Sequence, residues 1–244
     1  DREMEDMIYD RNSFQKFLGI DLLSHKVPDE TTILHFRHLL EAHKLQERFL
    51  KIVNAVLEKR GLLMKEGTIV DATIIAAPSS TKNQDKKRDG EMSSTKKGNQ
   101  WYFGMKAHIG VDAQSGMVHT LETSAAKVSD RKPFKKLLHG SERVIFGDKG
   151  YFKTEDKKEA RDKGILWAVS DRGTRNHPLS SSQRKRNRKF SSVRSKVEHP
   201  FQVIKCQWGF TKVRYKGLFK NTMQLFTLFS LANLFRARKL LSPA

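Results

Sequence analysis

The sequence predicts an α/β protein: a mixed sheet flanked by helices, with a helical module before it and a C-terminal helix after it. Apolar residues recur at helical spacing up to residue 66. From Thr68 onward, short β-branched runs alternate with helical patterns, which is typical of α/β domains. A strongly apolar helical stretch follows at 223–241. We therefore expect a helical module at 1–66, a sheet domain at 67–210 with a basic insertion at 78–99, and a basic segment with a helix at 211–244.

Charge narrows the class of partner. Lysine and arginine total 47 against 27 acidic residues, which gives a net charge of +20 and a pI near 10.1. Such a charge indicates a polyanionic partner, most simply nucleic acid, although membrane-surface and ribosomal proteins share it. A single cysteine, Cys206, excludes an intrachain disulfide and suits a reducing compartment. We find no signal peptide or membrane span, and because residue 1 is Asp we expect a fragment or a processed form.

The helical module begins with a broken apolar stripe that ends at Gly19. Pro28, Asp29 and Glu30 predict the start of a second helix, and a further stripe closes at Gly61. This module has two alternative roles: it contacts DNA or a second copy of the chain, or it only packs against the domain that follows.

The first strand carries an acid in its middle. TIVDATIIAA (68–77) is a β-branched apolar run, and Asp71 lies inside it. Burying a carboxylate is costly unless a cation or hydrogen-bond donor compensates. Asp71 is therefore a candidate metal ligand or catalytic acid, with pairing to a basic residue as the alternative.

Two further strands are expected after the insertion. Residues 78–99 are polar and basic, so we interpret them as a mobile surface loop. Residues 100–111 and 117–123 predict a hairpin whose turn includes Asp112. Asp130 precedes a short helical stretch and is interpreted as its cap.

A second acid ends the next strand. Residues 143–146 are apolar and lead into GDKGY (147–151), which places Asp148 at the strand's carboxyl end, where open α/β sheets put their chemistry. A simple β-turn aspartate is the alternative. A helix at 154–163, a strand at 165–169 and a basic loop at 172–189 follow. The candidate phosphate-binding residues of that loop are Arg184, Lys185, Arg186, Arg188 and Lys189.

The third acid, Glu198, lies in a helix predicted over 191–205. At 3.6 residues per turn, Arg194 and Lys205 project from nearly the same face as Glu198. Pro200 predicts a kink just after Glu198. A surface helix whose acid is neutralised by neighbouring bases is the alternative. The three tryptophans, including Trp101, are expected in the core.

These elements follow the order of an RNase H-like fold: an acid-bearing strand, two strands, a helix, an acid-bearing strand, a helix, a strand and an acid-bearing helix. The motifs VDATIIAAPSSTKN (70–83), FGDKGY (146–151) and R-x3-E-x6-K (194–205) resemble those of bacterial insertion-sequence transposases of the DDE type, in the group named after insertion sequence five. PDETTILHFRHLLE (28–41) is similar to that group's helical segment before the catalytic core. The resemblance covers nearly the whole chain. One departure is Ser191, where the group often has a tyrosine.

The resemblance implies that Asp71, Asp148 and Glu198 are the catalytic acids and metal ligands, supported by Arg194 and Lys205. It implies two Mg²⁺ ions, which Mn²⁺ can replace, since paired hard ions activate the nucleophile and stabilise the leaving oxygen. It further implies double-stranded DNA as partner (transposon ends and target), a homodimer, and a cytoplasmic, nucleoid-associated location. Relatives usually carry additional N-terminal sequence.

Three alternatives stay open on the sequence. An RNase H-like nuclease or resolvase would use the same acids without strand transfer. A DNA-binding remnant of a transposase would keep the fold without catalysis. A basic DNA-binding or ribosomal protein would explain the charge but not three acids in matching contexts.

Overall fold

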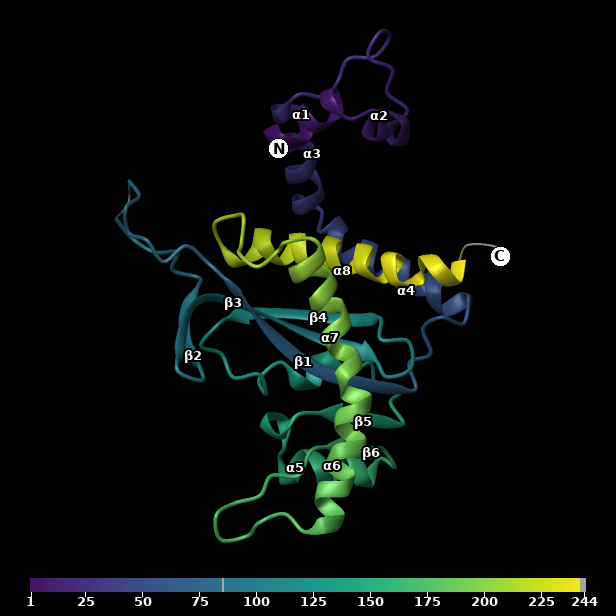
Figure 1. Ribbon diagram of the computed structural model, residues 1–244, viewed down its shortest axis with the longest axis vertical. Coiled ribbons are helices and arrows are strands. Elements are labelled where there is room, and N and C mark those ends of the chain that lie inside the picture. Colours follow the sequence, from purple (N-terminus) through teal and green to yellow (C-terminus); the bar gives the residue numbers. More distant parts are fainter. Residues whose placement is uncertain (85, 242–244) are drawn as a thin grey trace. The chain divides into compact units, whose positions relative to one another are not determined.

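The computed structural model describes residues 1–84 and 86–241 of the chain (Figure 1). It divides into two compact units, Asp1–Gln46 and Glu47–Ala244. The first unit contains the helices α1 (Arg2–Asp10), α2 (Asn12–Leu18) and α3 (Glu30–Ala42). Asp29 caps α3 by accepting a hydrogen bond from the Thr32 backbone N–H at 2.7 Å, so the helix start predicted there is confirmed. The sequence-based division at residues 66 and 210 stays a prediction.

The second unit is built around a six-stranded mixed sheet with the order β2-β3-β1-β5-β6, and β4 pairs with β3. Its strands are β1 (Gly67–Ala76), β2 (Ser93–Lys97), β3 (Gln100–Asp112), β4 (Val118–Ala125), β5 (Val144–Gly147) and β6 (Leu166–Val169). Strand β3 runs antiparallel to its neighbours β1, β2 and β4, whereas β5 and β6 run parallel to β1. The predicted mixed sheet is confirmed, and its strand order is that of an RNase H-like domain.

Strands β1 and β5 diverge shortly after they meet. Their pairing extends only as far as Ile69 opposite Phe146, after which β1 continues along β3 to Ala76. Near its end, β1 instead bonds the irregular segment at 208–217, where the Ala76 N–H donates a hydrogen bond to the Thr211 carbonyl at 3.1 Å. The predicted acids Asp71 and Asp148 each follow this last β1–β5 pair by two residues.

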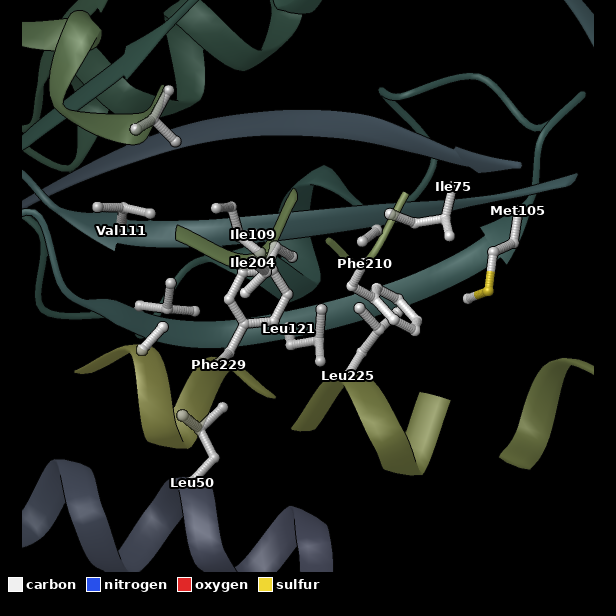
Figure 2. Packing of buried hydrophobic residues seen from close by; sticks show 14 of the residues in the cluster. Leu50, Ile75, Met105, Ile109, Val111, Leu121, Ile204, Phe210, Leu225 and Phe229 are labelled. Atoms are coloured by element: carbon white, nitrogen blue, oxygen red, sulfur yellow. The ribbon is translucent and has the colours of Figure 1, made fainter. Parts of the chain in front are cut away.

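One face of the sheet carries the main core. Figure 2 shows Ile109 and Leu121 of the sheet packed near Phe229 and Leu225, with Ile204 beside Ile109. Because side chains alternate along a strand, Asp71 lies on the same face of β1 as the buried Ile69 and Ile75. The acid therefore belongs to the face that the helices cover.

The helices of the second unit are α4 (Leu45–Lys59), α5 (Thr154–Asp162), α6 (Ser181–Arg194), α7 (Glu198–Gln202) and α8 (Leu218–Leu241). The first two residues of α4 precede the boundary of this unit at Glu47. Short 3-10 turns occupy Phe134–Leu137, Lys149–Tyr151 and Ser195–Val197, and a π turn occupies Val203–Gln207. Helix α6 packs on β5 and β6, and the 3-10 turn after it packs on β1. Over the described residues, no helix combines the length and the apolar character that crossing a bilayer requires.

Two segments expected to be loops contain regular structure. Strand β2 lies within the basic insertion at 78–99. Residues 172–189 were expected to be a loop, but α6 begins at Ser181, where Ser180 and Gln183 form a capping box. The five candidate phosphate-binding residues are therefore on a helix, and this part of the loop prediction is wrong.

The helical segment that carries Glu198 is irregular on both sides of this residue, because the π turn at Val203–Gln207 follows α7. A 3-10 turn covers Ser195–Val197, whereas Glu198–Gln202 is α-helical. The ring of Pro200 removes the N–H that would bond the Lys196 carbonyl, so the preceding turn tightens. The kink predicted just after Glu198 stays a prediction.

Candidate active site

Asp71 is a largely buried acid in the middle of β1. Its Oδ1 accepts a hydrogen bond from the Ala72 N–H at 2.8 Å. The pKa of Asp71 is raised from 3.8 to about 6. Burial is the main cause, the Ala72 bond and Arg194 act against it, and the charges of Asp148 and Asp130 add to it. The surroundings of Asp71 therefore disfavour its ionised form, and a bound cation would stabilise that form.

Asp148 lies directly after β5 and starts the 3-10 turn Lys149–Tyr151. Its Oδ1 accepts a hydrogen bond from the Gly150 N–H at 2.8 Å. A Cβ on Gly150 would lie 2.9 Å from that oxygen, so the glycine lets the carboxylate fold back over the turn. The structure thus brings Asp148 close enough to Asp71 for its charge to raise the pKa of Asp71, at the point where β1 and β5 diverge.

Lys205 anchors the helical segment to β1. Its Nζ donates hydrogen bonds to Thr73 Oγ1 and to the Ile74 carbonyl, each at 2.7 Å. Burial lowers the pKa of this ammonium, and the charge of Lys97 lowers it further. In this structure the donors of Lys205 are therefore directed to the strand that carries Asp71, and its supporting role at the site stays a prediction.

Glu198 is exposed at the start of α7. It lies one turn after Arg194, whose charge acts on Asp71, and one and a half to two turns before Lys205, which bonds β1. Glu198 is not among the groups that shift the pKa of Asp71. In the described residues, no three His, Cys, Asp or Glu side chains are grouped closely enough to hold a metal ion. The structure thus brings two of the three predicted acids together and leaves the third on the adjacent helix.

The basic residues of α6 extend away from the acids along the helix. All five are exposed: Arg184, Lys185, Arg186, Arg188 and Lys189. Arg186 is 3.0 Å from Asp171, and Arg184 bonds the Leu179 carbonyl at 3.1 Å. At 1.5 Å per residue, the cluster lies about 7–15 Å along the helix axis from Arg194. This separation suits a surface that holds a polyanion while one of its phosphates lies at the acids.

Comparison with known families decides the class of protein. The family model described as "Transposase DDE domain" matches residues 63–234. The chain belongs to the DDE transposase family. A second model, described as "Transposase domain (DUF772)", matches residues 1–39 of the same chain.

A solved structure is also similar to this transposase. Its title is "Cryo-EM structure of piggyBac transposase synaptic complex with hairpin DNA (SNHP)". The two chains are 9% identical, with a TM-score of 0.47, over 72% of this chain and 47% of that chain. The transposase described here thus spans about half the length of that protein.

Two residues near the acids of the transposase were not predicted as part of the site. Asp130 was expected to cap a helix, but its Oδ1 lies 2.7 Å from Lys106 Nζ. Tyr151, the last residue of the FGDKGY motif, is only 2% exposed, and its hydroxyl has no hydrogen-bond partner in the described part of the chain. Its position three residues after Asp148 was the available signal. Trp101, expected in the core, is 67% exposed on β3.

The donor set of the transposase fits a hard divalent cation. Mg²⁺ is usually held by one or two carboxylates, with water and substrate phosphate completing its coordination. Asp71 and Asp148 supply such a pair, and the raised pKa of Asp71 is what a cation would reverse. These two residues would hold the ion, with Glu198 as the additional candidate.

Proposed function

We propose that this chain is a DNA transposase of the group named after insertion sequence five, which hydrolyses phosphodiester bonds at transposon ends and transfers the strands to target DNA. The observation that carries the proposal is the meeting of Asp71 and Asp148 where β1 and β5 diverge, with Arg194 beside them. The basic helix α6 supports it, because it leads from the acids into solvent as a surface for duplex phosphates.

The chemistry follows from these residues. When bound, a pair of Mg²⁺ or Mn²⁺ ions lowers the pKa of a water or 3′-hydroxyl and neutralises charge on the leaving oxygen. Asp71 and Asp148 would hold the ions at the sheet, and the exposed carboxylate of Glu198 would be the additional ligand from α7. Arg194 offsets the charge of Asp71 before the metal binds. Lys205, in the π turn after α7, bonds β1 and so ties the helical segment that bears Glu198 to the strand that carries Asp71.

Duplex DNA at the transposon ends and at the target is the proposed partner. Two ends have to be brought together for transposition, so we propose a homodimer as the active form. A cytoplasmic, nucleoid-associated location follows from the same substrate.

The test is cleavage of a plasmid that carries the ends of the chain's own element, in Mg²⁺, by the wild-type protein and by Asp71→Asn, Asp148→Asn and Glu198→Gln. Each substitution should abolish cleavage while DNA binding in a gel-shift assay is kept. Glu155→Gln is the matched control, because this acid is exposed on α5 and pairs with Lys153. It should cut at the wild-type rate.

The products separate the alternatives. Joined target molecules are expected from a transposase. Cleavage without joined products would indicate a nuclease or resolvase. Cleavage by any of the three acid variants at the wild-type rate would remove that residue from the mechanism, and DNA binding without metal-dependent cleavage by the wild type would indicate a non-catalytic remnant.

A further inference from the structure

A groove lies between the basic insertion at 78–99 and the irregular segment at 208–217, within the second compact unit. Its volume is about 360 Å³. The described residues that line it include four with cationic side chains, Lys87, Arg88, Arg214 and Lys216, and one acid, Asp89. The groove is therefore a concave surface with an excess of positive charge.

The end of β1 joins the two walls of this groove. The Val213 N–H donates a hydrogen bond to the Ala76 carbonyl at 2.8 Å, and the Ala76 N–H donates one to the Thr211 carbonyl at 3.1 Å. The segment at 208–217 thus runs beside β1 at the point where the insertion leaves the strand. Because Val213 is also buried in the main core, this wall is fixed to the sheet.

Two acids of the insertion tie it to the start of α8. Asp89 Oδ2 accepts a hydrogen bond from the Gly217 N–H at 2.6 Å, and Glu91 Oε2 accepts one from the Leu218 N–H. Leu218 is the first residue of α8, so both carboxylates lie at the positive end of the helix dipole. The walls of the groove are therefore fastened together on this side as well.

The cations of the groove lack nearby counter-charges. Three of them are exposed and form no ion pair with a described residue: Lys87, Arg88 and Arg214. Arg88 is held in place from two sides, because its Nε donates a hydrogen bond to the Ser79 carbonyl at 2.8 Å and its guanidinium carbon lies 5.4 Å from the centre of the Phe103 ring. Like charges held together repel one another, so a polyanion that neutralises them is the ligand that this groove favours.

The groove and the basic residues of α6 lie at opposite ends of one helical segment (Figure 1). Residues 181–207 are helical throughout, and the chain then enters the wall of the groove. At 1.5 Å per residue, about 30 Å separate Arg188 from the end of the π turn, and Glu198 lies between them. This distance is close to one turn of B-form DNA, about 34 Å. A single duplex is therefore long enough to reach both basic surfaces.

We propose that this groove binds the phosphate backbone of duplex DNA, so that one duplex contacts the groove and α6 with a phosphodiester at the acids between them. Phosphate oxygens are the group recognised, because lysine and arginine side chains that are not ordered into a base-reading pattern contact the backbone. This inference rests on the proposed function, since it gives the same DNA substrate a second contact surface.

Lysine acetylation of the unsubstituted chain tests the location of the duplex. The chain is treated with an N-hydroxysuccinimide ester of acetate, with and without a duplex of about 30 base pairs (about three turns), and mass spectrometry measures the modification of each lysine. We expect the duplex to protect Lys87 and Lys216 in the groove together with Lys185 and Lys189 on α6. Lys59, which is exposed at the end of α4, should react equally in both samples.

The outcomes separate the inference from the proposed function. Protection of the α6 lysines without protection of the groove lysines would overturn the inference and leave the proposed function intact. Protection of no lysine by the duplex would overturn the proposed function. Protection of the groove lysines by polyglutamate but not by the duplex would identify an acidic protein as the ligand, and this result would overturn the inference too.

The salt dependence of duplex binding gives a second readout. Each phosphate contact contributes about 0.9 to the slope of the logarithm of the binding constant against the logarithm of the salt concentration. The double variant Lys87→Gln with Arg214→Gln should therefore have a slope that is shallower than that of the wild type by about 1.8.

The matched control is Lys59→Gln with Arg60→Gln, which removes one lysine and one arginine from the exposed end of α4. It should keep the wild-type slope. A wild-type slope in the groove variant, or an equal change in the control, would overturn the inference. If the groove variant does not fold, as judged by circular dichroism, the lysine protection of the unsubstituted chain decides.

Discussion

Asp71 should destabilise the metal-free protein, and its replacement by asparagine should therefore increase stability. Burial raises the pKa of this acid from 3.8 to about 6. Between these values the unfolded chain has released the proton that the folded chain keeps, so the free energy of unfolding falls as the pH rises from about 4 to about 6, and it stays lower above that range. A difference of about two pKa units corresponds to about 3 kcal/mol.

Asp71→Asn removes the charge and keeps an oxygen that can accept the Ala72 N–H bond of 2.8 Å. The variant should equal the wild type near pH 4 and exceed it by up to about 3 kcal/mol near pH 8. For a unit of this size, that gain is about 6–12 °C in melting temperature. Thermal unfolding in EDTA, followed by circular dichroism across this pH range, measures the difference.

The exposed Glu198 provides the control, since Glu198→Gln should not give a gain that grows with pH. Adding Mg²⁺ should raise the melting temperature of the wild type and not that of Asp71→Asn, because a ligand stabilises only the state that binds it. An asparagine variant less stable than the wild type near pH 8, or a gain independent of pH, would refute the reasoning.

Three further predictions concern the scaffold around the acids. Gly104→Ala should lower the free energy of unfolding by about 3 kcal/mol or more in urea denaturation, because a Cβ there would lie 2.1 Å from the Ile75 carbonyl oxygen. Lys205→Met should cost about 1–3 kcal/mol in the same assay, since it leaves the Thr73 hydroxyl and its neighbouring carbonyl without their 2.7 Å donor. Burial lowers the pKa of His119 from 6.5 to about 3. Each pH unit between these values should therefore reduce the free energy of unfolding by about 1.4 kcal/mol as the pH falls. His119→Gln should weaken this dependence of the free energy of unfolding on pH below about 6.5.

The sheet and two of its acids could be predicted because their signals are local. A β-branched run with one acid inside it identifies β1 and Asp71, and an apolar strand that ends in a glycine-flanked acid identifies β5 and Asp148. Neither pattern depends on a distant part of the chain. The two acids come near each other because β1 and β5 are paired over a short stretch. The order of the predicted elements indicated that these two strands would be neighbours.

Other features depend on contacts that no local pattern encodes. Helix α6 lacks an apolar stripe in its first half, so its basic composition suggested a loop, although Ser180 and Gln183 carried the capping signal. The pairing of Asp130 with Lys106 joins residues 24 positions apart on different elements. The donors of Lys205 are likewise directed to a strand more than a hundred residues earlier, a choice that helical spacing alone could not reveal.

The π turn at Val203–Gln207 makes the attachment of α7 sensitive to the number of residues in this turn. Such a turn holds one residue more than ordinary α winding, and here it ends the helical segment that begins with α7, because the residues after Gln207 are not helical. Within the wider turn, Ile204 packs in the core, and the next residue, Lys205, donates a hydrogen bond to Thr73 on β1. Removing one residue from this turn should therefore change which side chains reach the core and β1, and it should loosen the attachment of the helix that bears Glu198.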